Sequence, residues 1–216
     1  QGASGYAGAS DTYIYRYAET QSYSTSATIR LGGGGRYASL IRFDLASIPS
    51  NAVVTRASLQ VYAAAWSGYN VGMGAHVISR TVNLNEATWQ RSRSSELWGT
   101  AGCDSTVTDR RGLYESPVMT SGTGKGYHFP VAAAVQAWVN GDLSNNGLLL
   151  RGAFGSYYSG TVYFASSENG SVGLRPRLEV TYYLPGGLTP PPSLVIGHIT
   201  DVHVGSGIQL DGLVNS

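Results

Sequence analysis

The clearest alternation of hydrophobic and polar residues lies in the stretch 37–61 and predicts two β-strands joined by a turn. In the first strand, Ile41 and Phe43 fall on one face, which is the period-two pattern of a strand buried on one side. Leu40 falls on the opposite face together with Arg42. Two amphipathic strands are not stable alone in water, so the rest of the chain must supply a second apolar layer.

The segment 53–61 alternates in the same way after the turn-forming residues Ile48-Pro49-Ser50-Asn51. Its predicted inward residues are Val53, Ala57, Leu59 and Val61. Further strands are predicted at 12–15, 27–31, 75–80, 127–131, 148–150, 161–165 and 177–183. About nine short strands separated by turn residues predict an all-β fold, a β-sandwich or jelly roll.

One segment, 132–140, has helical periodicity and predicts a single short helix, with Gly141 suited to its C-terminal end. The segment 81–125 is long and irregular and contains Trp89 and Trp98. A loop of this length is expected to pack on the sandwich, and we expect it to cover one end.

A change in composition near residue 185 predicts three parts. Residues 1–184 form the sandwich, residues 185–193 are a linker stiffened by prolines, and residues 194–216 are a C-terminal segment that carries one extra strand.

Charged residues make up only 12% of the chain, whereas Gly (29) and Tyr (15) are abundant, which suits short strands and tight turns. The formal net charge of +1 argues against nucleic-acid binding, which needs a concentrated basic surface. No stretch has the apolar length of a membrane span. Cys103 is the single cysteine, so no intrachain disulfide is possible, and it is expected to be buried.

The sequence starts at Gln1 instead of Met, as a mature chain does after removal of a signal peptide. Together with the low-charge composition this predicts a secreted, extracellular or cell-surface protein. A sequence whose first residue was set by the choice of an expressed segment would also start without Met.

The order of seven blocks resembles the DNRLRE-type domain, a family related to the alginate-binding carbohydrate-binding modules. The blocks are RFDLASIP, ASLQVY, EATW, VQAWVNG, NNGLLLRG, FASSE and RPRLEVTY, and they span about residues 11–183. The resemblance implies a secreted jelly-roll module that is often attached to polysaccharide-active enzymes or cell-surface proteins. A fold resemblance does not fix the ligand.

Aromatic residues in Gly/Ser-rich loops are candidates for stacking on sugar rings, because loops on a rigid sandwich commonly carry function. These candidates are Trp66, Tyr69, Tyr157 and Tyr158. Ordinary loop packing is the alternative for all four. Trp89 and Trp138 are expected to fill the core instead.

Arginine supplies nearly all of the positive charge and can bind a carboxylate with two parallel hydrogen bonds. Four arginines are candidates for a cationic groove that binds the carboxylates of an acidic polysaccharide: Arg42, Arg151, Arg175 and Arg177. For Arg42 the alternative is an ion pair with Asp44 within the framework.

Four carboxylates near predicted strand ends are candidates for a structural calcium ion, which takes six to eight oxygen ligands. They are Asp11, Glu86, Asp104 and Glu168. The Asp-x-Asp-x-Asp pattern of a calcium loop is absent from the sequence.

The tail contains the sequence IGHITDVHVGSG, which resembles the first metal-binding motif of calcineurin-like metallophosphoesterases. By that resemblance, Asp201 and His203 would ligate one ion of a two-metal centre. The later ligand blocks of that family are missing here, so the chain as it stands is expected to be no enzyme.

Alternating residues in the tail also predict a strand that could add to a sheet edge, in its own domain or in a neighbouring copy. Three functions remain open from the sequence. The first is a non-catalytic extracellular module that binds an acidic polysaccharide. The second is a subunit of an extracellular filament in which each copy donates its C-terminal strand to the next. A third alternative is the N-terminal part of a secreted metallophosphoesterase.

Overall fold

The computed structural model describes residues 6–112, 118–152, 160–185 and 193–196, and within this part the predicted all-β fold is confirmed. The strands are β1 (Ala9–Tyr15), β2 (Thr28–Gly32), β3 (Tyr37–Phe43), β4 (Val53–Trp66), β5 (Val71–Val77), β6 (Arg91–Arg93), β7 (Glu96–Leu97), β8 (Val118–Thr120), β9 (Lys125–Pro130), β10 (Leu148–Gly152), β11 (Thr161–Ala165), β12 (Arg177–Tyr183) and β13 (Ser193–Ile196). The helix α1 spans Ala132–Val139, and a 3-10 turn, η1, spans Val172–Leu174.

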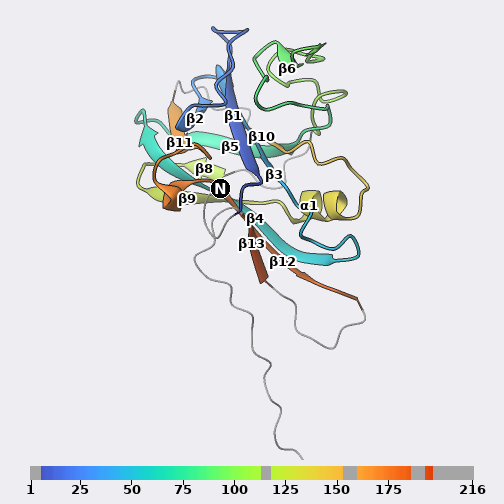
Figure 1. The fold of residues 1–216 in the computed structure, drawn as a ribbon. Helices are drawn as coiled ribbons and strands as arrows, with labels where there is room; N and C mark the ends of the chain where they lie inside the picture. The colour runs from blue at the N-terminus through green and yellow to red at the C-terminus, as the bar shows by residue number, and fades with distance from the viewer. Residues whose placement is uncertain (1–5, 113–117, 153–159, 186–192, 197–216) are drawn as a thin grey trace, which may run out of the picture.

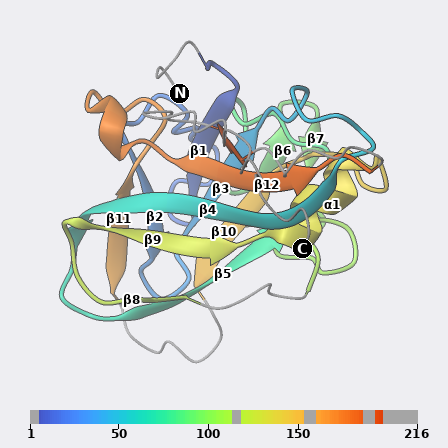
Figure 2. The same cartoon turned by 90° about the horizontal axis from the view of Figure 1, so that it is seen from below.

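The main sheet is antiparallel and folds into two layers that nearly close on each other (Figures 1 and 2). In one layer the long strand β4 lies between β12 on one edge and β9 on the other. In the other layer β1, β3, β10, β5 and β8 follow one another. Beyond β12, the end of β4 pairs with β11, β11 pairs with β2, and β2 meets β3, so that this side of the sandwich is closed.

The main core fills the space between the two layers. Of the inward residues predicted for β4, Ala57, Leu59 and Val61 are buried there, and Ile41 and Phe43 of β3 lie in the same cluster. The prediction was wrong for Val53, because the register of β4 shifts near its start and Val54 packs against the core instead. Phe129 of β9 is fully buried in it as well. Apart from Val53, the alternation in the sequence therefore identifies the inner face of these two strands correctly.

The outer face of the second layer is also buried, which corrects the expectation that β3 has one buried side. Leu40 has no exposed surface and belongs to a second apolar cluster. The full cluster is Ile14, Ala38, Leu40, Ile78, Val82, Leu84, Ala87, Trp89, Trp98, Cys103 and Leu149. Most of the members outside the strands come from the irregular segment 79–112. That segment therefore packs on a face of the sandwich, and the prediction that it covers one end was wrong.

Buried Trp89 and Cys103 confirm two further expectations. The helix α1 is confirmed with nearly the predicted bounds, and its buried Val135 and Val139 pack on the main core. Trp138 is partly buried against the same core. Gly141 has φ +79° and donates its N–H to the carbonyl of Trp138, as expected of a glycine that ends a helix.

Tyrosines and one arginine form a compact group where β1 meets β2 and β11. The ring of Tyr13 stacks on Tyr23 at 4.2 Å, and the guanidinium of Arg30 lies 5.0 Å from the Tyr13 ring centroid. The same guanidinium lies 5.2 Å from the ring of Tyr163. Part of the high tyrosine content is therefore used in packing the sandwich.

The C-terminal strand β13 pairs antiparallel with β12 of its own chain, from Leu178 with Ile196 to Thr181 with Ser193. It thus occupies the edge of β12. Most of the predicted linker and all of the tail after residue 196 lie outside the described residues. Among the helices of the described part, none combines the length and apolar character needed to cross a bilayer.

Candidate ligand-binding groove

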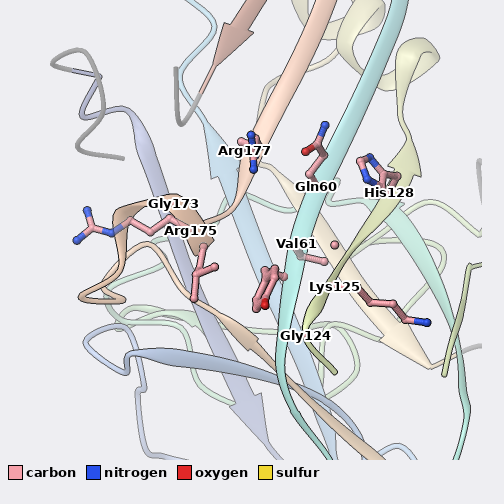
Figure 3. A pocket seen from close by; sticks show the side chains of 11 residues that line it. Gln60, Val61, Gly124, Lys125, His128, Gly173, Arg175 and Arg177 are labelled. Carbon is pink, nitrogen blue, oxygen red and sulfur yellow. The ribbon is translucent and has the colours of Figure 1, made fainter. Parts of the chain in front are cut away.

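A hollow of about 410 Å³ lies on the outer face of the β12–β4–β9 layer, which we call the open face (Figure 3). Residues from all three strands and from η1 line it: Gln60, Val61, Tyr62, Gly124, Lys125, Gly126, His128, Gly173, Leu174, Arg175 and Arg177. It contains two of the four arginines that the sequence predicts for a cationic groove. We call this hollow the groove.

Strand register places three polar side chains of the groove in one row. Arg177 of β12 is opposite Gln60 of β4, and Gln60 is opposite His128 of β9. Figure 3 shows the three following one another across the strands. Neighbouring strands lie about 4.8 Å apart, so the row spans about 10 Å. The neighbours of Gln60 and His128 on both sides are buried in the core, as is Leu178 after Arg177, so pleating directs all three side chains outward.

A hydrogen bond holds one side chain of this row in place, whereas another has no described partner. The Gln60 Nε2 donates to the Glu179 Oε2 at 3.1 Å, which turns the amide oxygen of Gln60 away from that carboxylate. The side chain of Arg177 makes no hydrogen bond or ion pair with any residue that the structure describes. Its guanidinium therefore lines the groove without an ion pair to any carboxylate in the part of the chain that the structure describes.

The second arginine of the groove, Arg175, follows η1 and is more firmly held. Its Nε donates to the carbonyl oxygen of Asn169 at 2.7 Å. Lys125 also lines the groove, but its ammonium donates to Ser121 Oγ and lies 5.5 Å from the Tyr127 ring centroid. Three cationic side chains therefore line the groove, and two of them, Arg175 and Lys125, have hydrogen-bond partners in the protein.

Two positions along β4 from Gln60, an aromatic residue lies opposite a residue without a side chain. Tyr62 of β4 is half-buried and lies opposite Gly126 of β9, which has no side chain. The Tyr62 hydroxyl lies 4.0 Å from the position a Cβ would take on Gly124. The ring of Tyr62 therefore borders an open strip of two glycines, next to a donor-rich row.

The other two predicted arginines lie elsewhere. Arg151 donates to the carbonyl oxygen of Gly102 and to Asp104 Oδ2, both at 3.0 Å, and so ties segment 79–112 to β10. Arg42 lines a separate hollow of about 400 Å³ with Ser10 and Asp44. The Asp44 carboxylate accepts the N–H of Ala46, and no ion pair joins it to Arg42 among the described residues. The single groove with four arginines that the sequence predicted does not form.

The loop aromatics are divided between described and undescribed residues. Trp66 packs against the main core and donates its Nε1 hydrogen to the carbonyl oxygen of Tyr69. Tyr69 is 56% exposed, and neither residue lines the groove. Tyr157 and Tyr158 lie outside the described residues.

The four candidate calcium carboxylates have different partners. Asp104 forms ion pairs with Arg110 and Arg151, and exposed Glu86 accepts the N–H of Ser94. Asp11 is buried and accepts the N–H of Ser167 at 2.6 Å. Burial raises the pKa of Asp11 to about 7, against the hydrogen bond from Ser167, which lowers it, and the nearby charge of Glu168 raises it further.

Asp11 and Glu168 of that set are close enough for the charge of one to act on the other. Within the described ranges there is no group of three or more His, Cys, Asp or Glu side chains that could hold a metal ion. Asp201 and His203 lie outside those ranges.

Sequence reasoning missed most residues of the groove, among them Gln60, Tyr62 and His128. A signal was present, because each is an outward position on a strand whose inward residues are apolar. Placing them together required the pairing of β4 with β9, which are more than sixty residues apart in the chain.

Comparison with known proteins does not add a family. Neither the protein-family models nor the curated proteins include one that matches this chain.

Proposed function

We propose that the protein is a non-catalytic module that binds an acidic polysaccharide in the groove of the open face. The observation that carries the proposal is an outward-facing arginine, Arg177, that has no carboxylate partner among the described residues and lies in one row with Gln60 and His128. A guanidinium is suited to a uronate carboxylate, and the amide and imidazole are suited to sugar hydroxyls.

The groove also has the partly apolar character that sugar rings require. Tyr62 supplies an aromatic side chain bordered by glycines, and an aromatic ring offers apolar surface without closing the site. The order of sequence blocks resembles the DNRLRE-type domain, a family related to alginate-binding modules, and this resemblance agrees with the same ligand class without fixing the ligand. Secretion or attachment to a cell surface is part of the proposal, because such polymers are extracellular.

Calorimetric titration with alginate, and with the neutral polymer dextran for comparison, tests the proposal. We expect alginate to bind and dextran to bind much more weakly or not at all. Loss of a charge-assisted hydrogen bond is worth about 1.5–3 kcal/mol, so Arg177→Gln is expected to weaken alginate binding by about tenfold to a hundredfold.

A matched control is Arg16→Gln, which removes the same charge from an exposed position in the turn after β1. It is expected to leave the affinity nearly unchanged. Equal losses for both variants would show that only net charge matters and would contradict a site in the groove. Absence of binding to alginate and to other acidic or neutral glycans would reject the function itself.

A further inference from the structure

The glycine at position 126 is unusual for its place in the fold. It lies within β9, in continuous antiparallel pairing with β4, opposite Tyr62. A glycine in a strand weakens it, because the unfolded chain has more freedom to lose and no side chain packs on the neighbours. Such glycines are commonly explained by a bulge, by close approach of another backbone, or by a ligand that needs the space.

The first two explanations fail at Gly126. The pairing from Ser58 with Pro130 to Ala63 with Lys125 contains no shift of register, so there is no bulge. A Cβ placed on Gly126 would meet a single described atom within 4 Å, the Nε2 of His128 at an ordinary 3.7 Å. The backbone φ is also outside the left-handed region that favours glycine.

Gly147 shows what a structurally required glycine looks like in the same protein. It has φ +91°, and a Cβ there would lie 2.5 Å from the carbonyl oxygen of Ile41. Among the described residues, nothing comparable surrounds Gly126. The space above Gly126 is bounded by Tyr62, by His128 and by the row that contains Arg177, and it opens into the groove.

We propose that one sugar ring of the bound polysaccharide packs over Gly126. The absence of a side chain there leaves the space that lets the groove accept a ring-shaped acidic unit. This inference rests on the proposed function and assigns the ligand's position within it. The ring lies over the bare backbone of β9 beside Tyr62, and its carboxylate is directed to Arg177. Its hydroxyls reach the amide oxygen of Gln60 and the imidazole of His128.

The test is Gly126→Val, which fills the space without changing any charge. We expect the affinity for alginate to fall at least tenfold, while the melting temperature stays the same or rises, because valine favours a strand. Gly126→Ala is expected to give a smaller loss. The matched control is Gly170→Val, at a glycine outside the groove with open space around its Cβ position, which should leave alginate binding unchanged.

Poly-L-glutamate, a flexible polyanion without rings, distinguishes binding of a sugar ring over Gly126 from general attraction between charges. Any weak binding of it should be equal in the parent protein and in Gly126→Val. If Gly126→Val binds alginate as the parent does while Arg177→Gln is still impaired, the sugar ring does not lie over Gly126, but the proposed function stands. A melting temperature lowered as much as in Gly147→Val would show that Gly126 has a structural role and would also overturn the inference. Failure of the parent protein to bind alginate would instead reject the proposed function.

Discussion

The two outer faces of the sandwich are built from similar strands, but one is exposed and the other is buried. On the open face, outward residues such as Gln60 and Arg177 line a groove. On the other face, which we call the covered face, segment 79–112 buries the outward residues Leu40 and Leu149 in a second core. The comparison shows that an outward strand position has no fixed role, because a long connection can turn it into core.

The polar residues of the covered face are used for support. Asp109 is fully buried and accepts hydrogen bonds from the N–H groups of Gly99, Thr100 and Ser105. Arg80 donates to the same carboxylate at 2.8 Å. Burial raises the pKa of Asp109, but the backbone donors and Arg80 outweigh it and hold this pKa below its ordinary value. This carboxylate organises the covering segment.

Removal of that carboxylate is the strongest test of the covered face. Asp109→Ala leaves several donors without an acceptor and the Arg80 guanidinium without its buried partner. We expect a loss of about 3–5 kcal/mol in the free energy of unfolding. Urea denaturation of the parent and the variant measures it, and a loss below about 1 kcal/mol would mean that the segment is held in another way.

Truncation of Leu40 tests whether the second cluster is a true core. Leu40→Ala should cost about 3 kcal/mol, as buried leucines do when a cavity remains. The same truncation on the open face, Gln60→Ala, should change the free energy of unfolding by no more than about 0.5 kcal/mol. Similar losses for the two variants in urea denaturation would show that the faces do not differ as described.

Two buried titratable groups give the protein opposite pH dependences. Burial raises the pKa of Asp11 to about 7, so the folded state holds this proton more tightly than the unfolded state, and stability falls as pH rises from about 4 to 7. On the covered face, burial and the charge of Arg110 lower the pKa of His76 to about 4. Stability from His76 is therefore gained as pH rises from about 4 to 6.5.

Single substitutions separate the two contributions. Between pH 4 and 6.5, Asp11→Asn should become more stable relative to the parent as pH rises, and His76→Gln less stable. Each slope is at most about 1.4 kcal/mol per pH unit. Chemical denaturation across this range measures both, and parallel pH profiles for the parent and either variant would contradict the assignment of that group.

The smallest expected change in stability comes from a comparison of substitutions at two arginines. Arg151→Gln breaks the bond to Asp104 and should cost about 1–2 kcal/mol of stability. Arg177→Gln should cost less than about 0.5 kcal/mol, because no described residue pairs with Arg177. A marked loss of stability in Arg177→Gln would show that this residue serves the fold and not a ligand.

Period-two alternation predicts the inner core because the burial of Ile41 and Leu59 is a local property of each strand. It does not predict the burial of Leu40, because a segment distant in the sequence covers that residue. For the same reason, Arg151 and Arg177 have equal chemistry in the sequence but different surroundings in the fold. The groove residues Gln60 and His128 could be identified as outward, yet their proximity depends on long-range strand pairing.

The most direct test of the account is an NMR titration of the ¹⁵N-labelled protein with a short oligomer of alginate. We predict that the largest shift changes fall on Gln60, Tyr62, Gly126, His128 and Arg177, and that amides of segment 79–112 stay in place. Changes concentrated on the covered face, with the groove unaffected, would contradict the account.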